Sequence, residues 1–473
     1  MLGDLGDQPW INPAPKTDRH FDNFTQSGGI MSPILRKLML ILVVSFTSLV
    51  PHHPAVAADV YVDCLSSNAK TFHSINDALN TLDLVGPNTI TVKGVCRENV
   101  VIASRDRLTI TGADGQHATI EAKDPGITLF VLGSHNITLD HLIIQRGAPA
   151  LYVTSSSTNM DVQNCIIQNS DSDGLIMEMH SAMTMENTTI QNNSGSGINM
   201  ANESHLTMAT YPNQLTMLTG NGGDGLTIDG SQVQINFGVV SITGNAGAGI
   251  SMLGGRLQAY GGDGNTFALI DNNAYGGLVM STGASATLWG EFHISNNGST
   301  GIALSSASSL GLYSSNHRAA VTRVNGHSTV GLSLSSSSAA ELYGPHVISN
   351  NGSANADPGS RGGISMEGAS LIMDYGVSVS GNVGPGIRLA AKSDISLANG
   401  IVSNNSEEGV RQTNLSAGGF YNPLTFAGNG GNNLYCDKFS VAFGDAGSIP
   451  NSNCPNITES SGRHPGVRIP RMH

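Results

Sequence analysis

Aromatic side chains recur at a nearly constant distance after a repeated glycine, and this spacing points to a binding surface. Twelve residues after that glycine stand Phe237, Trp289, Tyr313, Tyr343, Tyr375 and Tyr421, and Tyr260 stands at eleven. The chain has only 2 Trp, 10 Tyr and 12 Phe in 473 residues, so chance placement would not gather seven of them in one register. Outward rings on successive rungs could hold the apolar faces of sugars. We therefore expect Tyr260, Trp289, Tyr313 and Tyr343 to bind a polysaccharide.

Charged side chains near these aromatic residues could supply an acid and a base. Glu341 and Asp374 lie close to the aromatic positions, and Arg318 and Arg323 lie in the long segment 314–329. A carboxylic acid beside a cationic base is a combination that could cleave a chain of uronic acids. Solvated surface charge accounts for the same residues without any chemistry. No complete hydrolase, lyase or esterase motif accompanies them, so the sequence assigns no catalytic residue.

Asparagine occupies a second repeated position, four residues before the glycine. The residues there are Asn193, Asn221, Asn245, Asn273, Asn297, Asn382 and Asn405. Asparagine tolerates the left-handed backbone of a tight turn, and its amide can bond to the asparagine one rung away. We expect a stacked structural ladder without a catalytic role.

The repeat that carries these positions is a glycine followed by an apolar residue, any residue and another apolar residue. It occurs at Gly126, Gly174, Gly197, Gly225, Gly249, Gly277, Gly301, Gly331, Gly363, Gly386 and Gly409, with Ala150 as a variant, at intervals of 23 to 32 residues. Each interval holds short segments in which apolar and polar residues alternate, such as 137–139 and 395–397, which predict three strands per repeat. The expected fold is all-β: a single-domain right-handed parallel β-helix of about 12 coils.

The sequence resembles the right-handed parallel β-helix proteins of the pectin-lyase-like family over roughly residues 60–445. The run Val92–Ile102 looks like the family's first coil, where a tyrosine is usual at the position of Cys96, and this departure supports a Cys64–Cys96 disulfide. The resemblance implies enzymes that cleave acidic polysaccharides, using paired carboxylates, or calcium-binding carboxylates with an arginine or lysine base. This sequence shows no complete set, so we expect no metal or cofactor, with calcium needed only if the protein is a lyase.

Both ends of the predicted solenoid look capped. Ser74 begins a short N-terminal helix, with Asp77 reaching back and Phe72 packing beside it. Cys436 and Cys454 could form a second disulfide near the C-terminus. The expected division is β-helix with its N-terminal cap at 58–445, then a disulfide loop and disordered tail at 446–473.

The segment before the solenoid has the pattern of an export signal. Residues 31–57 hold a basic start, an apolar run and an Ala-x-Ala sequence before Ala58, which is typical of a cleaved signal peptide. Residues 1–30 show no pattern of their own, and we expect them to be a non-native or untranslated extension. The mature protein would be secreted or periplasmic, without a membrane anchor, and a monomer. A formal net charge of -13 makes nucleic acid a poor partner.

Three functions follow from these patterns. The first is binding of polysaccharide along the aromatic positions, and the second is a polysaccharide lyase or glycoside hydrolase acting on glycans that contain uronic acids. The third is a non-catalytic structural or adhesive surface protein, in which aromatic pairs merely stabilise and cover a sheet.

Overall fold

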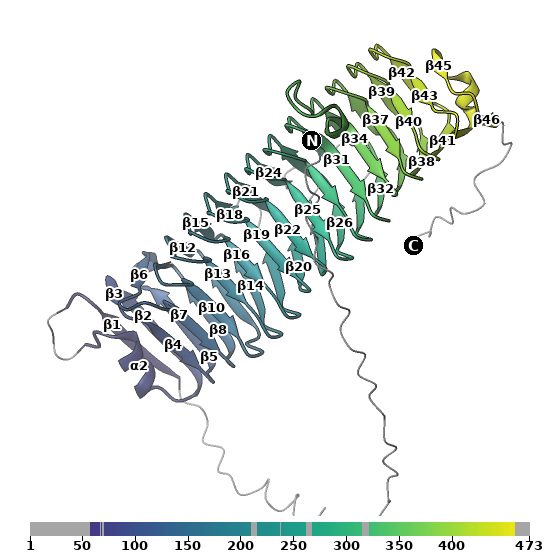
Figure 1. Ribbon diagram of the computed structural model, residues 1–473. Helices are drawn as coiled ribbons and strands as arrows, with labels where there is room; N and C mark the ends of the chain where they lie inside the picture. The colour runs from purple at the N-terminus through teal and green to yellow at the C-terminus, as the bar shows by residue number, and fades with distance from the viewer. Residues whose placement is uncertain are drawn as a thin grey trace, which may run out of the picture. The chain divides into compact units, whose positions relative to one another are not determined.

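The computed structural model describes residues 57–458, except 67, 69, 70, 210–214, 237, 262–266 and 315–320. The described chain winds into a parallel β-helix whose three sheets run along one axis, with the N-terminal coils in purple and the last coils in yellow (Figure 1). The chain passes through sheets A, B and C in turn, and each strand pairs in parallel with the strand one coil away. The expected fold is confirmed.

Sheet A has 17 strands and carries most of the residues discussed below. They are β1 (Ala58–Asp63), β2 (Val85–Lys93), β5 (Asp106–Gly112), β8 (His135–Asp140), β11 (Met160–Gln163), β14 (Ala182–Glu186), β17 (His205–Ala209), β20 (Gln232–Asn236), β23 (Arg256–Tyr260), β26 (Ser285–Trp289), β29 (Ser309–Tyr313), β32 (Ala339–Tyr343), β35 (Ser370–Asp374), β38 (Asp394–Ala398), β41 (Ala417–Tyr421), β44 (Val441–Gly444) and β46 (Ile457–Thr458).

Sheet B has 14 strands. They are β3 (Val95–Arg97), β6 (Ala118–Glu121), β9 (Leu142–Gln145), β12 (Ile166–Gln168), β15 (Thr189–Gln191), β18 (Leu215–Thr219), β21 (Val239–Thr243), β24 (Phe267–Asp271), β27 (Glu291–Ser295), β30 (Arg323–Asn325), β33 (Val347–Ser349), β36 (Ser378–Ser380), β39 (Ile401–Ser403) and β42 (Thr425–Ala427).

Sheet C has 15 strands and contains the repeated glycine just before most of them. They are β4 (Val100–Ala103), β7 (Leu129–Leu132), β10 (Leu151–Thr154), β13 (Leu175–Met177), β16 (Ile198–Met200), β19 (Leu226–Asp229), β22 (Ile250–Leu253), β25 (Leu278–Ser281), β28 (Ile302–Leu304), β31 (Val330–Ser335), β34 (Gly362–Glu367), β37 (Ile387–Ala390), β40 (Val410–Gln412), β43 (Leu434–Cys436) and β45 (Ser452–Asn453).

The solenoid has about 14 turns, more than the 12 expected from the repeated glycine. The difference lies at the two ends, where coils form without that glycine. Strands β2 to β6 precede Gly126, and β45 and β46 lie beyond residue 445, where we had expected only a loop and a tail. Parallel pairing is made by backbone hydrogen bonds, so a coil can form without the glycine signature; β2 and β5 bury alternate residues, and β45 pairs although it is only Ser452–Asn453.

The core lies inside the solenoid and is built from alternate residues of all three sheets. In β29, for example, Leu310 and Leu312 point inward and are almost fully buried, whereas Ser309 and Tyr313 lie outside. Parallel strands of neighbouring coils repeat this alternation in register, so each inward residue stacks on its equivalent one rung away. The same alternation fixes which residues face outward.

The N-terminal cap is the helix α2 (Ile75–Thr81), which buries Ile75, Ala78 and Leu79 against the first coils. Ser74 is its N-cap and its Oγ accepts a hydrogen bond from the backbone N–H of Asp77. The residue that reaches back to the helix start is Glu98, not Asp77, because its carboxylate accepts bonds from the Ser74 hydroxyl at 2.9 Å and the Ile75 N–H at 2.6 Å. A carboxylate is stabilised at a helix N-terminus, where backbone N–H groups have no partner within the helix.

Two disulfides close the ends of the described solenoid, as expected. Cys64 is bonded to Cys96 with Cα atoms 5.2 Å apart, and Cys436 to Cys454 with Cα atoms 4.5 Å apart. The described residues also form the short 3₁₀ helices η1 (Ala113–Gly115), η3 (Pro358–Ser360) and η4 (Asp445–Ser448).

The predicted leader and tail lie almost wholly outside the described part of the chain. Of segment 31–57 only residue 57 is described, and residues 1–30 and 459–473 are not. Within the described ranges, none of the helices combines the length and the apolar composition that a membrane crossing requires.

Candidate functional site

The predicted aromatic residues share one column on the outer face of sheet A, at the corner where each coil turns into sheet B. Tyr260 pairs in register with Trp289, Trp289 with Tyr313, and Tyr313 with Tyr343. All four side chains are partly exposed and alternate with buried residues. The column therefore continues across four successive coils.

The flanking members of the column differ from the expectation. Asn236 pairs with Tyr260, so the column position of that coil belongs to Asn236, and Phe237 lies outside the described residues. Asp374 pairs with Tyr343, and Tyr375 comes one residue later with a left-handed φ of +64°. This backbone turns the exposed Tyr375 ring back to within 4.4 Å of the Tyr343 ring, centroid to centroid, at an interplanar angle of 46°.

Trp289 and Tyr313 stack on each other, which limits what they can offer a ligand. Their ring centroids are 4.6 Å apart and their planes differ by 27°. The rings therefore cover each other's facing sides along the solenoid axis, as an aromatic cross-strand pair does. The side of each ring that faces its partner is closed to a sugar.

The hydroxyls of Tyr260 and Tyr313 point back over the middle of sheet A. The hydroxyl of Tyr313 donates to Glu341 Oε2 at 2.9 Å, and Gln258 Nε2 donates to the Tyr260 hydroxyl at 3.4 Å. Burial and the Glu341 carboxylate together raise the pKa of Tyr313 to about 12. Tyr313 therefore stays protonated at ordinary pH and does not act as a base; because its O–H is donated to Glu341, its hydroxyl oxygen can serve a ligand as an acceptor.

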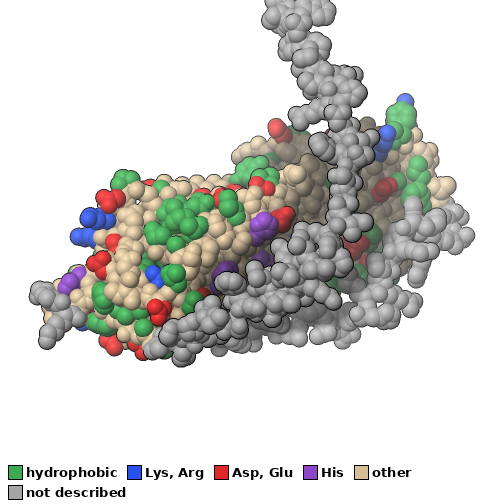
Figure 2. Space-filling view, turned by 90° about the horizontal axis from the view of Figure 1, so that it is seen from below, with side chains coloured by type: hydrophobic (Ala, Val, Ile, Leu, Met, Phe, Trp, Pro, Cys, Tyr) green, Lys and Arg blue, Asp and Glu red, His purple; other side chains and the backbone are tan. Residues whose placement is uncertain are grey.

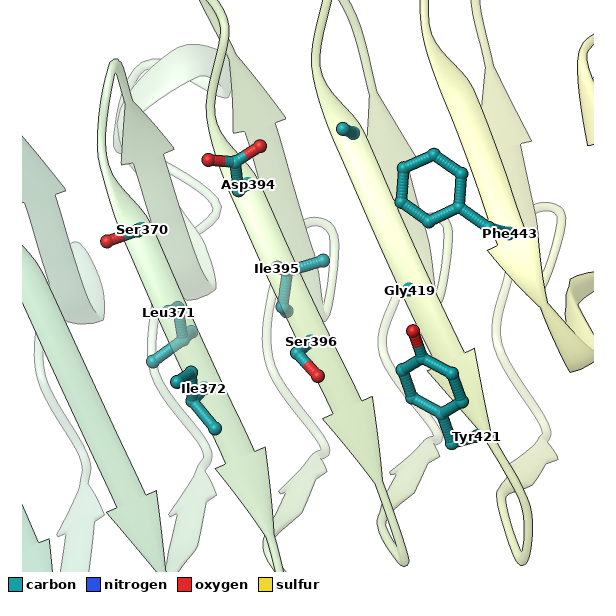
Figure 3. A pocket seen from close by; sticks show the side chains of 10 residues that line it. Ser370, Leu371, Ile372, Asp394, Ile395, Ser396, Gly419, Tyr421 and Phe443 are labelled. Atoms are coloured by element: carbon teal, nitrogen blue, oxygen red, sulfur yellow. The ribbon is translucent and has the colours of Figure 1, made fainter. Parts of the chain in front are cut away.

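A groove of about 290 Å³ lies on sheet A in the last coils, across β35, β38, β41 and β44, and Tyr421 is the column position that lines it. Its floor is low because the outward residues there include the small Ser396 on β38 and Gly419 on β41, beside the rings of Tyr421 and Phe443 (Figure 3). Figure 3 shows both rings broadside, with the Tyr421 hydroxyl directed toward Gly419. Ser370 and Asp394 line the polar end of the groove. Apolar ring faces beside hydroxyl and carboxylate groups are the arrangement that sugars fit.

Glycine at position 419 is what allows Tyr421 to lie over its own strand. A Cβ atom at Gly419 would come 3.0 Å from Cε2 and from the hydroxyl oxygen of Tyr421. Gly311 has the same relationship to Tyr313, where the corresponding Cβ would lie 2.4 Å from Cε2. Both glycines make room for a tyrosine two residues later, and both backbones belong to sheet A.

The predicted catalytic residues do not converge on one point. Glu341 and Asp374 face outward from neighbouring strands of sheet A, where Asp374 Oδ1 accepts from the Tyr375 N–H and from Asn399 Nδ2. Arg323 faces outward from sheet B, in register with His293, and Arg318 lies outside the described residues. The two long turns lie at different corners of the solenoid: residues 314–322 join sheets A and B, whereas residues 350–361 join sheets B and C.

The N-terminal half of the same corner column is polar. Thr111, Asp140, Gln163 and Glu186 are paired in register, and the column continues through Ala209 to Asn236. Asp140 Oδ1 lies 2.7 Å from His141 Nδ1 and accepts from Asn164 Nδ2 at 2.9 Å. Burial opposes the ionisation of Asp140, but these bonds and His141 outweigh it and leave the pKa of that carboxyl lowered. The column is thus anionic at one end and aromatic at the other.

Hydrogen bonds link the predicted asparagine ladder inside the solenoid. Asn193 Nδ2 donates to Asn221 Oδ1 at 2.9 Å, and the same bond recurs from Asn221 to Asn245, Asn245 to Asn273, Asn273 to Asn297 and Asn382 to Asn405. Three members were missed by the sequence interpretation, namely His327, Asn351 and Asn429. His327 lies in the segment 314–329, in which we had expected charged side chains, but it is buried and takes the place of an asparagine.

A cluster of possible metal ligands in the described chain comprises Cys64, Cys96 and Glu98. The two sulfur atoms are bonded to each other, and the Glu98 carboxylate is already occupied by the N-terminus of α2. These three residues therefore do not fit a metal, because a thiolate and a free carboxylate are needed. Cys165, which is in neither disulfide, is buried, and burial raises the pKa of its thiol to about 12.

The outer face of sheet C carries a second aromatic pair. Phe130 is stacked on Tyr152, with ring centroids 5.3 Å apart, whereas Thr128, two residues before Phe130, is fully buried. Toward the C-terminus the turn that contains η3 contacts this sheet, because the Arg388 guanidinium donates to the backbone carbonyl of Gly359. Figure 2 shows one face of the molecule, on which green and tan side chains dominate and charged ones are scattered.

Comparisons with known proteins agree with the fold. The family model described as right handed beta helix region matches residues 99–267. No curated protein matches the chain. Among solved structures, a pectate lyase, Pel9A, is similar at 12% identity with a TM-score of 0.40, over 60% of this chain and 78% of that one.

Two further solved structures are similar to the chain. The A-module of the mannuronan C-5 epimerase AlgE4 from Azotobacter vinelandii is 14% identical, with a TM-score of 0.39, over 79% of this chain and 91% of that one. The catalytic domain of a GH87 alpha-1,3-glucanase is 14% identical, with a TM-score of 0.23, over 85% of this chain and 68% of that one.

Proposed function

We propose that this chain, a right-handed parallel β-helix repeat protein of the pectin-lyase-like family, binds a polysaccharide on the outer face of sheet A. The observation that carries the proposal is the groove lined by Tyr421 and Phe443, on the same sheet as the corner column of Tyr260, Trp289, Tyr313 and Tyr343. Asp374 and Ala398 hold the column position in the two coils between Tyr343 and Tyr421. Successive rungs are ~4.8 Å apart, close to the length of one pyranose unit, so a glycan lying along the axis meets an equivalent position at each sugar.

The groove and the column have different parts in this proposal. Tyr421 and Phe443 present ring faces beside the small residues Ser396 and Gly419, so they stack against the apolar faces of sugars. Trp289 and Tyr313, whose facing sides are closed, contribute their ring edges and the Tyr313 hydroxyl. The aromatic pair thus also stabilises sheet A, which combines our binding and structural interpretations of these residues.

The experiment is a glycan-array screen of the folded chain, followed by titration of each hit. Alanine at Tyr421 and at Phe443 should weaken binding, because each removes one stacking face. Tyr152→Ala is the matched control, since Tyr152 is also an outward, partly exposed tyrosine but lies on sheet C. Equal binding by the parent and the double variant would contradict the proposal. No binding to any glycan on the array would favour a non-catalytic structural or adhesive surface protein.

Catalysis is tested on the same glycans. Glu341 and Asp374 remain the candidate acids on this face, with Arg323 on the neighbouring sheet B. Release of reducing ends would indicate a hydrolase, and an unsaturated product absorbing in the ultraviolet would indicate a lyase, for which calcium would then be tested. Binding without product would establish a binding solenoid.

We further propose that the protein is exported and that residues 31–57 are removed. Both disulfides suit an oxidising compartment. N-terminal sequencing of the mature protein should begin at Ala58. A mature protein that retains residues 38–50 would contradict cleavage at this site.

A further inference from the structure

The charges on the outer face of sheet A restrict the class of glycan that this face can accept. From β8 to β44 the described outward residues include six carboxylates and one guanidinium. The carboxylates are Asp140, Asp161, Glu186, Glu341, Asp374 and Asp394, and the guanidinium is that of Arg256. The whole chain is also acidic, with a formal net charge of -13. The face that we propose to bind a polysaccharide is therefore strongly negative.

Three of these carboxylates border the aromatic column and the groove. Asp394 lines the groove itself, and Asp374 holds the column position next to Tyr343. Glu341 accepts a hydrogen bond from the Tyr313 hydroxyl. The ion pairs between described residues include none of the three. In the described chain, Asp374 accepts hydrogen bonds from Asn399 and from the Tyr375 N–H.

The cationic side chains of Lys392, Arg256 and Arg323 form none of the ion pairs between described residues. Lys392 stands two residues before Asp394, on the exposed turn that leads into β38. Arg256 stands at the first outward position of β23, four residues before Tyr260, and so at the opposite edge of sheet A from the column. Arg323 points outward from sheet B, around the corner. Neither side chain lies among the residues that line the groove.

In the N-terminal half of the outer face of sheet A, burial and one carboxylate together raise the pKa of a neighbouring carboxyl. Asp161 lies between Thr138 and Thr184 on adjacent strands, and Glu186 occupies the corner column one strand further along. Burial, and then the charge of Asp161, raise the pKa of the Glu186 carboxyl. A carboxylate that already disfavours a neighbouring carboxylate would equally disfavour one brought by a ligand.

From this arrangement we infer that the polysaccharide bound by sheet A is an uncharged glycan, one that carries neither carboxylate nor sulfate groups. The inference rests on the proposed function and names its substrate class. Hydroxyl groups of a neutral sugar can donate to Glu341, Asp374 and Asp394, and such charge-assisted bonds are strong. A uronic acid in the same place would set a second negative charge within several ångströms of each of them.

The test uses one glycan in two forms. A neutral oligosaccharide identified on the array is titrated against the protein, and then the same oligosaccharide after oxidation of its primary alcohols to carboxylates. The neutral form should bind with an affinity that changes little with salt. The oxidised form should bind at least about tenfold more weakly at low salt. In 0.5 M salt the Debye length falls to about a few ångströms, so the repulsion is screened and part of the affinity should return.

A charge-neutralised variant separates electrostatics from fit. Replacing Glu341→Gln, Asp374→Asn and Asp394→Asn together keeps the size of each side chain and removes three charges. This variant should bind the oxidised glycan several-fold better than the parent does. Asp357→Asn, on the turn between sheets B and C, is the matched control and should leave the discrimination unchanged.

The outcomes distinguish this inference from the function on which it rests. An array that yields only uronic-acid or sulfated glycans would overturn the neutral-substrate inference and leave polysaccharide binding intact. So would an oxidised form that binds as well as the neutral one, with or without added calcium. An array that yields nothing would overturn both. Neutral hits whose oxidised forms bind weakly in the parent, and recover in the triple variant, would establish the inference.

Discussion

The hydroxyl of Tyr313 donates a hydrogen bond to Oε2 of Glu341, 2.9 Å away on the next coil. The two residues come from β29 and β32, and Gly311 leaves the space in which the tyrosine ring lies over its strand. This bond connects the aromatic column to the carboxylates of sheet A. It also makes the ionisation of Tyr313 depend on the charge at position 341.

Glu341→Gln should therefore lower the pKa of Tyr313 from about 12. The carboxylate opposes formation of a tyrosinate beside it, and glutamine keeps a hydrogen-bond acceptor without the charge. Because burial is the larger cause, the pKa should remain above the ordinary value of about 10. Ultraviolet titration of tyrosinate measures this, with Tyr313→Phe identifying which step belongs to Tyr313. An unchanged titration curve in the Glu341→Gln variant would show that the pair is not coupled.

His327 takes an asparagine's place in the buried ladder. Its Nδ1 accepts from the backbone N–H of Asn297, and its Nε2 donates to the carbonyl of Ile294. Burial lowers the pKa of His327 to about 4, so the folded protein holds it neutral while the unfolded chain would protonate it near 6.5. Stability from this group is present above pH 6.5 and falls by about 3 kcal/mol as the pH drops to about 4.

His327→Asn should reduce that loss, since asparagine is the residue that the ladder uses in neighbouring coils. Urea unfolding at pH 7 and at pH 4.5 measures the difference for the parent and the variant. His346 is also buried with its pKa lowered to about 4, so its own contribution to the acid loss should be the same in both proteins, and His327→Asn should reduce the total loss without abolishing it. If His327→Asn left the pH dependence of stability unchanged, His327 would not be the neutral ladder residue that the fold requires.

The C-terminal disulfide should protect only the last coils. Cys436 and Cys454 are separated by 18 residues, and closing a loop of that size contributes about 3 kcal/mol in the chain-entropy account. Replacing both cysteines by serine should raise amide hydrogen exchange in β43 to β46 and leave β26 and its neighbours unchanged, since each coil contacts only the next. Uniformly faster exchange along the solenoid would show instead that the coils unfold as one unit.

Glycine at position 419 should prove necessary for the groove. Gly419→Ala places a Cβ atom 3.0 Å from the Tyr421 ring, so the ring must move and the groove must change shape. We expect glycan affinity to fall by about threefold to tenfold while the melting temperature changes by only a few degrees. Other glycines are unsuitable as controls. At Gly298 an added Cβ would lie 2.1 Å from the Ala274 backbone, and Gly230 has a left-handed φ of +56°, which strains alanine. Ser396→Ala, in the same groove, is the control for small changes of its floor.

The fold was predictable because local and repeated signals agree. The glycine repeat and the asparagine four residues before it follow one coil length, and inward apolar residues alternate with outward ones in most strands. Three ladder members escaped for different reasons. Asn351 is followed by the long turn that delays its glycine to Gly363, His327 has the right spacing before Gly331 but the wrong residue type, and Asn429 has Asn433 where the glycine would stand.

The site was predictable only in part. The register of Tyr260, Trp289, Tyr313 and Tyr343 followed from spacing, but whether stacked rings expose their faces depends on side-chain rotation, which spacing does not determine. Phe443 lies beyond the last repeated glycine, so no period pointed to it, although it completes the groove with Tyr421. Arg323 seemed close to Glu341 in the chain, but a coil places them on different sheets.

The measurement that tests the account most directly is titration of an array-identified glycan against the parent and the Tyr421→Ala, Phe443→Ala double variant. Loss of two stacking faces, each contributing about 0.5 to 1.5 kcal/mol, predicts binding weaker by roughly fivefold to a hundredfold, with Tyr152→Ala unchanged. The same affinity in the double variant as in the parent, with both proteins folded, would contradict the claim that sheet A binds the glycan.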